Sequence, residues 1–419
     1  MNSRVLANII NEMISNISLL ERKTTLSREE CGSINEVVLD GDKYYYYSTR
    51  GITPSLRRFL NSIESNSKQI CELNLGSTEL EMEYIKRSLA IDWIRNEYSE
   101  IVTKTEWNAI FDYIFSISNR TYENLPNSIN IIINLTEEGN TCLLDVEEHK
   151  ILDVLACSNY TYLEVDKNLN IIKYDCIDIG DVSTKNTYTD VPDYLLPYSQ
   201  YTFNTGKIDK ICISLSRTGD IVLHANADQI LSIRKKTWTI YNNASLKNTL
   251  YDILLSVSCP YAIACNLYDL IWNISYRRHG ALIIVAIEER GDNNIVNQES
   301  ILEKSSKKEL RYVIKDDIEK IDISKTGIIN KKALLLELVS VDGATVIDCV
   351  NGRVRAFGSI IELHKDVNNV SGARTTAAKS AIRHGNMRPI KISSDGDITF
   401  YHCISDNQGN KHYIEFSFC

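Results

Sequence analysis

Proline is scarce in this chain, and its scarcity limits how the chain can be divided. Only 6 of the 419 residues are proline, and no run rich in glycine, serine and proline separates one part of the sequence from another. A flexible linker needs such a composition. Because the chain exceeds the size at which a single core usually divides, we expect two or three domains that are packed together or joined by short connections.

The sequence also lacks paired cysteines. Its 11 cysteines include no C-x-x-C pair, and none lies with histidine at the spacing of a zinc site. An odd and scattered set of cysteines is typical of reduced thiols in the cytosol. We therefore expect a cytoplasmic protein.

An excess of positive charge and a long apolar run are absent as well. The net charge of -9 and the pI near 5.4 argue against nonspecific binding to nucleic acid or to acidic membranes. No stretch reaches the roughly 18 to 20 apolar residues of a membrane span. In 1–23 the apolar residues recur at helical spacing between asparagines, which predicts an amphipathic packing helix and no secretory signal. We expect no membrane contact and no direct nucleic-acid binding.

The periodicity of apolar residues predicts three regions. Residues 1–128 show mainly helical spacing, although four consecutive tyrosines at 44–47 favour a half-buried strand over a base-stacking platform. Residues 129–243 contain short apolar runs separated by turn residues, which predicts a small antiparallel meander. Residues 244–419 alternate strands and helices, which indicates a domain built on a central sheet. The predicted fold class is therefore α+β or mixed α/β.

Two short segments of the last region join a glycine to an apolar strand. In 277–285, two arginines and a histidine precede Gly280, as is typical of a helix end. In 341–347, Asp342 stands directly before Gly343 and Ala344. Glycine would allow a ligand to approach the backbone, and the Asp342 carboxylate could hold Mg²⁺ or Mn²⁺ bridging phosphates. Asp-Gly is also a common pair in hairpin turns, so this segment alone leaves both interpretations open.

A third segment, 370–385, predicts a helix whose start could bind a phosphate. Gly372 precedes a stretch of small residues, and the free N–H groups at a helix N-terminus attract anions. Arg374, in the first turn, opposes the helix dipole unless an anion lies beside it. The surrounding stretch 367–394 has five lysines and arginines and no acidic residue. This local reversal of charge favours a phosphate pocket over a solvated basic face.

Taken in order, these segments resemble the nucleotide-binding domain of the diadenylate cyclase family. The matching residues are Gly280-Ala281-Leu282, Asp342-Gly343-Ala344, Gly372-Ala373-Arg374-Thr375-Thr376, Ile392-Ser393 and Ile398-Thr399-Phe400-Tyr401. The resemblance covers about residues 244–419. It implies a central mixed sheet flanked by helices.

The resemblance also implies roles for single residues. In the family, the aspartate of Asp-Gly-Ala supports the metal and the attacking ribose hydroxyl, so Asp342 would be the catalytic and metal-binding residue of an active enzyme. The residues implied to contact the nucleotide are Gly343, Ala344, Gly372, Ala373, Arg374, Thr375, Thr376 and Ser393. Ala373, Thr375 and Thr376 stand where the family has threonine, histidine and arginine. Losing two charge-assisted contacts, worth about 1.5 to 3 kcal/mol each, predicts weak triphosphate binding unless Lys379 or Arg383 compensates.

Three functions follow from this comparison of motifs. Our first hypothesis is a sensor of ATP, another nucleotide or a nucleotide second messenger, of the kind found in bacterial defence signalling. It would act through a homo-oligomer or through a partner effector chain. The second is an active cyclase that condenses two ATP molecules to cyclic di-AMP with Mg²⁺ or Mn²⁺. The third is a degenerate domain that serves only as a protein-interaction module.

Overall fold

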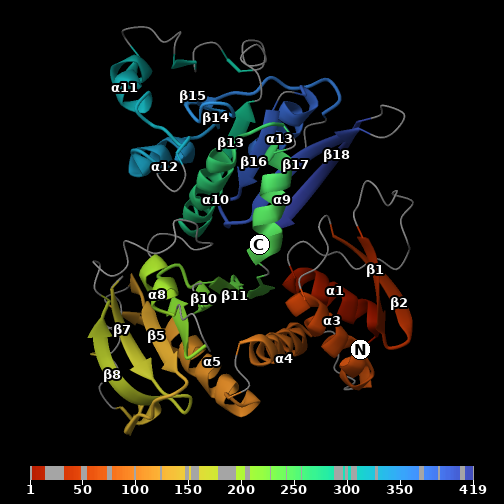
Figure 1. Cartoon of the computed structure of the whole chain (residues 1–419), viewed down its shortest axis with the longest axis vertical. Helices are drawn as coiled ribbons and strands as arrows, with labels where there is room; N and C mark the ends of the chain where they lie inside the picture. The colour runs from red at the N-terminus through yellow and green to blue at the C-terminus, as the bar shows by residue number, and fades with distance from the viewer. Residues whose placement is uncertain are drawn as a thin grey trace. The chain divides into compact units, whose positions relative to one another are not determined.

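A computed structural model of the chain divides into two compact units, residues 1–245 (unit 1) and 246–419 (unit 2), which we describe separately (Figure 1). The structure describes residues 2–14, 33–48, 54–72, 78–98, 101–122, 125–146, 151, 160–177, 195–202, 208–226, 228–241, 243–255, 257–286, 296–297, 301–302, 309–325, 329–367, 372–385, 387–405 and 411–418. Within these ranges, no helix is both long enough and apolar enough to cross a membrane.

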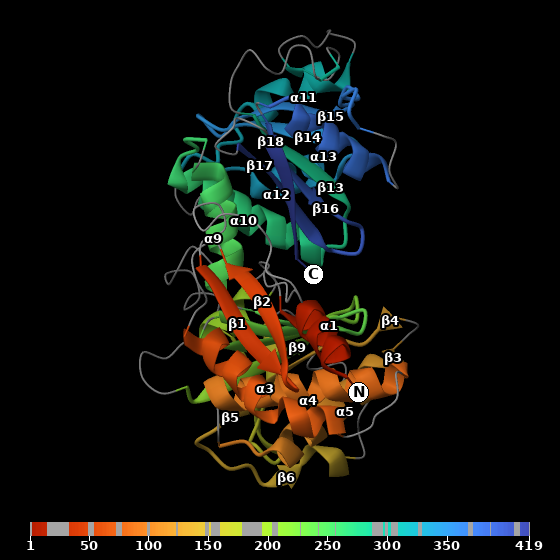
Figure 2. The ribbon, with the colours of Figure 1, turned by 90° about the vertical axis from the view of Figure 1, so that its right-hand side faces the viewer.

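The helices of unit 1 begin at well-formed caps. Thr78 and Thr103 each close a capping box with the glutamate three residues later, which satisfies N–H groups at the start of a helix. The helices are α1 (Ser3–Met13), α3 (Pro54–Glu72), α4 (Glu79–Glu97), α5 (Lys104–Ser118), the short 3-10 helix η1 (Leu143–Asp145) and α8 (Leu196–Tyr201). Figure 2 shows α1, α3, α4 and α5 together on one side of the unit. The amphipathic helix expected over 1–23 is α1, and residues 15–23 lie outside the described part.

The tyrosine run forms a strand. Strands β1 (Ser33–Leu39) and β2 (Asp42–Ser48) make an antiparallel hairpin. Tyr44 and Tyr46 are buried on one side of it, as the alternation of a half-buried strand requires. A second small hairpin pairs β3 (Thr121–Tyr122) with β4 (Leu125–Pro126).

The main sheet of unit 1 has eight strands in the order β12-β11-β10-β9-β5-β7-β8-β6. They are β5 (Ile129–Asn134), β6 (Thr141–Cys142), β7 (Thr161–Val165), β8 (Asn170–Cys176), β9 (Lys210–Leu215), β10 (Ile221–Ala225), β11 (Asp228–Arg234) and β12 (Thr237–Ile240). The sheet differs from the small antiparallel meander predicted for 129–243, because β5 and β7 pair in parallel. One hydrophobic core joins residues from Leu6 to Ile240, since the helices of 1–128 bury their apolar faces on this sheet.

The two faces of this sheet differ in polarity. Ile131 and Leu163 point into the hydrophobic core. Successive side chains alternate between the faces, and the opposite face carries Asn134, Glu164 and His224, which are only 2%, 1% and 0% exposed. A sheet buried on both faces usually carries apolar residues on both. The buried polar face therefore needs a local explanation.

Unit 2 is built on a six-stranded sheet in the order β15-β14-β13-β16-β17-β18. Its strands are β13 (Ala281–Ala286), β14 (Ala344–Asp348), β15 (Val354–Ser359), β16 (Met387–Ile392), β17 (Ile398–Ser405) and β18 (Lys411–Phe418). Its helices are α9 (Asn243–Leu255), α10 (Tyr261–Tyr276), α11 (Leu310–Ile318), α12 (Lys332–Ser340) and α13 (Ala373–Arg383). Among the described strands of this sheet, β13 and β14 pair in parallel and the other pairs are antiparallel. The predicted mixed fold class is confirmed.

Helix α13 packs on the sheet of unit 2 through small and apolar residues. Ala378 and Ile382 share a core cluster with Leu282 and Ile284 of the central strand β13. Helix α12 packs on β13, β14 and β15 of the same sheet, and α10 packs on β16. This packing holds the N-terminal end of α13 against the ends of the central strands.

Candidate functional site

The strand register brings the predicted site segments of unit 2 to one edge of the sheet. Leu282 lies opposite Ala344 in the parallel pair, and Ala281 lies opposite Ile392 in the antiparallel pair. The starts of β13 and β14 and the end of β16 therefore meet. The residues next to these strand ends therefore lie at the same edge; they are Gly280, Asp342, Gly343 and Ser393.

Gly343 owes its place to close backbone packing. Its φ is +107°, and a β-carbon added there would lie 2.6 Å from the carbonyl carbon of Gly358 at the end of β15. Asp342 and Gly343 connect α12 to a strand that is parallel to β13, so they do not form the hairpin turn that was one interpretation of the sequence. Ala344, the first residue of β14, is fully buried inside the sheet.

The start of α13 carries no side-chain cap. Gly372, with φ +100°, occupies the N-cap position and has no side chain that could accept a hydrogen bond from the first N–H groups. Ala373, the first helical residue, is exposed. Thr376 directs both its N–H and its hydroxyl to the Gly372 carbonyl oxygen, at 3.1 and 3.2 Å. The backbone N–H groups of the first turn are the ones that a ligand could use.

Arg374 reaches from α13 across the sheet edge. Its guanidinium covers Gly280, because a β-carbon added to that glycine would lie 2.7 Å from Nη1 and 3.0 Å from Cζ. Its Nη2 donates to Oδ1 of Asp342 at 3.2 Å, and the side chains of Arg374 and Asp342 are 34% and 97% exposed. We expected an anion beside Arg374, and the Asp342 carboxylate lies there, so the position of Arg374 does not by itself require a bound phosphate.

A second cation approaches the same helix start from the sheet. Lys391 of β16 donates from Nζ to Oγ1 of Thr375 at 3.2 Å. The other basic residues considered for this role lie elsewhere. Lys379 pairs with Glu415 at 2.8 Å, and the Arg383 guanidinium stacks over the Tyr413 ring at 4.7 Å. Neither side chain can therefore supply the positive charge that Thr375 and Thr376 do not provide at the start of α13.

Ser393 has a structural task in this structure. Its Oγ accepts from the backbone N–H groups of Asp395 and Asp397, at 3.2 and 3.1 Å, and so shapes the turn between β16 and β17. The turn is held further by Ser275, whose hydroxyl donates to the Gly396 carbonyl at 2.5 Å. A nucleotide could use Ser393 only through its remaining hydroxyl proton.

The site offers one carboxylate to a metal ion. No group of three or more His, Cys, Asp or Glu side chains suited to a metal occurs in the described ranges. Asp342 is exposed and could bind Mg²⁺ or Mn²⁺ only together with ligand phosphates and water, which is how Mg²⁺ is commonly held beside nucleotides.

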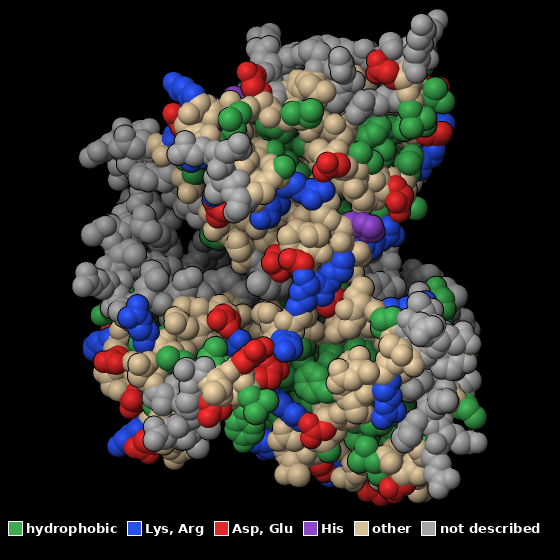
Figure 3. All heavy atoms as spheres, turned by 180° about the vertical axis from the view of Figure 1, so that it is seen from behind, with side chains coloured by type: hydrophobic (Ala, Val, Ile, Leu, Met, Phe, Trp, Pro, Cys, Tyr) green, Lys and Arg blue, Asp and Glu red, His purple; other side chains and the backbone are tan. Residues whose placement is uncertain are grey.

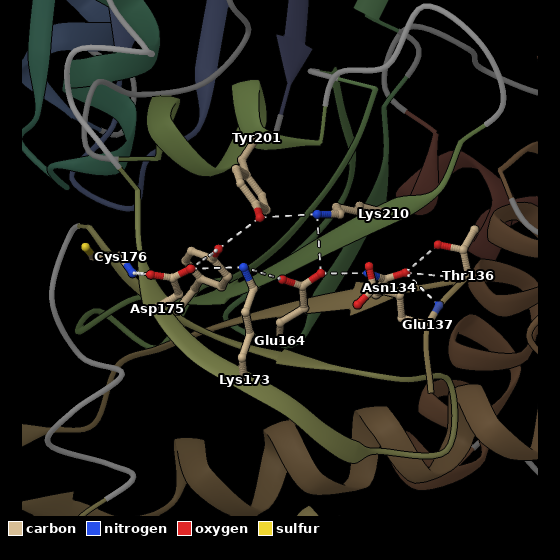
Figure 4. A network of polar contacts seen from close by, with 10 residues as sticks. Asn134, Thr136, Glu137, Glu164, Lys173, Asp175, Cys176, Tyr201 and Lys210 are labelled. Carbon is tan, nitrogen blue, oxygen red and sulfur yellow. Dashed lines mark hydrogen bonds and ion pairs between the residues drawn. The ribbon is translucent and has the colours of Figure 1, made fainter. Parts of the chain in front are cut away.

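A separate polar cluster lies on the buried polar face of unit 1 (Figure 4). We call it the lysine–glutamate cluster; it consists of Asn134, Tyr162, Glu164, Lys173, Tyr201 and Lys210. The hydrogen bond to Asp175 is the main reason that the pKa of Lys173 is raised. Burial lowers the pKa of Lys210, but contacts with Tyr201 and Glu164 outweigh burial and raise it overall. Both amines are therefore charged and suit ion binding rather than nucleophilic attack.

Sequence reasoning missed this cluster. The segment 129–134 reads as an apolar strand, and only its two asparagines interrupt the run. A polar residue at alternate positions of several neighbouring strands would have been the signal. That signal needs the strand order, which periodicity alone does not contain.

The surface of the protein shows no extended field of one charge on the face in Figure 3, where acidic and basic side chains are interspersed over the described residues.

Comparisons with known proteins identify no family. No family model matches the chain, and no curated protein matches it. Among solved structures, a hypothetical membrane-spanning protein from Bacillus cereus matches with 18% identity and a TM-score of 0.28, over 40% of this chain and 71% of that chain. DacA from Staphylococcus aureus matches with 19% identity and a TM-score of 0.20, over 40% of this chain and 88% of that chain. Both TM-scores are too low to support an inference.

Proposed function

We propose that unit 2 binds the phosphate of a nucleotide at the start of α13 and acts as a nucleotide sensor. The observation that carries this proposal is that two cations belong to the uncapped start of α13: Arg374 lies in its first turn, and Lys391, from β16, donates to Thr375 of the same turn. Two cations and free N–H groups at a positive helix end suit an anion. The order of motifs in the sequence, which resembles the diadenylate cyclase family, supports a nucleotide as the bearer of that anion.

Binding without turnover is the form of this function that we favour. A triphosphate needs more positive charge than two side chains supply, and Lys379 and Arg383 are engaged elsewhere. The single carboxylate, Asp342, is held by Arg374 rather than turned to a metal. These features suit a nucleotide with one or two phosphates, or a cyclic dinucleotide.

An active diadenylate cyclase is the second candidate. It is favoured by the position of Asp342, whose 97% exposed carboxylate stands beside the start of α13 and could exchange its arginine partner for a metal ion. Incubation with ATP and Mg²⁺ or Mn²⁺ separates the two candidates. We expect little or no cyclic di-AMP, whereas substantial product that is lost in Asp342→Asn would establish the enzyme.

Binding itself is tested by calorimetry with ATP, ADP, AMP and cyclic di-AMP. Saturable binding of one of them to the wild type, weakened in Arg374→Ala and in Lys391→Met, is the expected result. Lys379→Met serves as a control, since it removes a cation from the same helix that is paired with Glu415 and not with a residue of the helix start. If no nucleotide binds, unit 2 is better explained as a protein-interaction module.

We further infer that a sensor of this kind passes its signal to a second copy or to a partner effector chain, as in bacterial defence signalling. Light scattering with and without the bound nucleotide tests the first route. A change of mass on nucleotide addition is expected there, and co-purification of a second chain is expected for the other.

A further inference from the structure

The lysine–glutamate cluster is organised around a buried carboxylate. Glu164 is 1% exposed, and its Oε1 accepts from Nδ2 of Asn134 at 2.7 Å. Asn134 is itself held, because its Oδ1 accepts from the N–H groups of Thr136 and Glu137 at 2.9 and 3.1 Å. The orientation of the carboxylate is thus set by the backbone.

Two lysines, from β8 on one side of β7 and from β9 on its other side, meet at this carboxylate. Nζ of Lys210 lies 3.3 Å from Oε1 and Nζ of Lys173 lies 3.6 Å from Oε2 of Glu164 (Figure 4). Lys210 also donates to the Tyr201 hydroxyl at 3.2 Å, and Lys173 also contacts Asp175 at 2.9 Å. An ammonium group has three N–H donors. Lys210 therefore keeps one donor beyond these two contacts, whereas Lys173 also contacts the Tyr162 hydroxyl. The side chains of Lys210 and Lys173 are 22% and 43% exposed.

A tyrosine pair adds a third polar group. The Tyr201 oxygen accepts from Lys210 and from the Tyr162 hydroxyl, the latter at 2.9 Å. Tyr201 is partly exposed, as are the side chains of Lys173 and Lys210, so a ligand can reach all three groups.

Stability does not account for such an arrangement. Removing a carboxylate and an ammonium group from water is costly, and well-packed apolar residues often replace a buried pair without loss of stability. Given this cost, the cluster should not stabilise the fold more than an apolar sheet face would. What an apolar face cannot supply is a pair of ordered ammonium groups at the surface.

We propose that the lysine–glutamate cluster is a binding site for a small molecule that carries an oxyanion, a phosphate or a carboxylate group. The oxyanion accepts from Lys173, Lys210 and Tyr201, and Glu164 serves as the positioning residue that keeps the two ammonium groups together. Lysine is a common partner of phosphate, which it binds as a point charge. The site lies in unit 1 and is independent of the nucleotide site proposed for unit 2.

Titration of the full chain with inorganic phosphate and, separately, with acetate tests this site. All proteins carry Arg374→Ala, so that the start of α13 does not contribute to the signal. The variants are Lys173→Met and Lys210→Met, and Lys104→Met is the control. Lys104 matches Lys173 in exposure, at 42%, and pairs with Asp92 at 3.4 Å outside the cluster.

The expected result is saturable binding of phosphate or acetate that weakens at least about 10-fold in both cluster variants and is unchanged in the control, as the loss of a charged hydrogen bond requires. Lys210→Arg keeps the positive charge and should restore part of the binding. That result would show that the loss of charge, and not unfolding, weakens binding in Lys210→Met. Whichever probe binds more tightly identifies the oxyanion. The absence of saturable binding, or equal weakening in Lys104→Met, overturns the proposal.

Discussion

Replacing Gly280 by alanine displaces Arg374 without removing its charge. The added β-carbon would lie 2.7 Å from Nη1 of Arg374, which is the end of a flexible side chain, so the side chain swings away and the backbone stays. The ion pair with the exposed Asp342 that is lost contributes at most about 1 kcal/mol. Replacing glycine in a permitted conformation stabilises by about 0.4 to 1 kcal/mol. The free energy of unfolding of Gly280→Ala should therefore stay within about 1 kcal/mol of the wild type.

Nucleotide binding should respond differently. If Arg374 binds a phosphate from its position over Gly280, the loss of that charged hydrogen bond costs about 1.5 to 3 kcal/mol, or about 10- to 150-fold in affinity. Calorimetry with the nucleotide that binds the wild type measures the affinity, and denaturant unfolding measures the stability. Wild-type affinity in Gly280→Ala would refute the assigned position of Arg374. A large loss of stability would show that the contact is a tight structural one.

Gly343→Ala is the matched comparison. Here the added β-carbon meets backbone atoms, 2.6 Å from the carbonyl carbon of Gly358 and 2.8 Å from the nitrogen of Ser359, and the φ of +107° is itself unfavourable for alanine. Backbone strain of this kind costs about 1 to 3 kcal/mol before any clash is counted. The two glycines stand at one sheet edge, yet one substitution should affect binding and the other stability.

Further predictions concern Arg374 and the buried face of unit 1. Because its Asp342 partner is 97% exposed, Arg374→Ala should change the free energy of unfolding by less than about 1 kcal/mol while weakening nucleotide binding; a melting temperature several degrees lower without nucleotide would contradict this. Burial lowers the pKa of His224 to about 3, below the value of about 6.5 in an unfolded chain. The free energy of unfolding should therefore be unaffected by His224 above about pH 6.5 and should fall as the pH falls toward 3. The expected decrease between pH 7 and pH 5 is about 2 kcal/mol. Denaturant unfolding followed by tryptophan fluorescence should show this loss in the wild type and a smaller one in His224→Gln; equal losses would exclude His224 as the cause.

The sequence by itself determined the class of fold and the segments of unit 2 that lie together. Helical spacing in the first part and alternating strands and helices in the last follow from local periodicity, which depends on neighbouring residues alone. The tyrosine strand is another case, since alternate burial of Tyr44 and Tyr46 follows from the geometry of any strand. The order of motifs predicted that Asp342 and Arg374 belong to one site, and the two side chains are in contact at one sheet edge, while their role in binding stays a prediction.

Tertiary structure alone decided which charges meet. Arg374 and Asp342 are 32 residues apart in the chain, and Lys391 reaches Thr375 across 16 residues. Lys210 joins Glu164 only because β9, β5 and β7 are neighbours in the sheet, with β5 and β7 in parallel. A change of strand order or a shift of register by one residue would move every one of these side chains to another partner or to the other face. Sequence periodicity indicates which face of a strand each side chain occupies, but it does not indicate which strands lie next to it. The neighbouring strands determine which residues a charged side chain can contact.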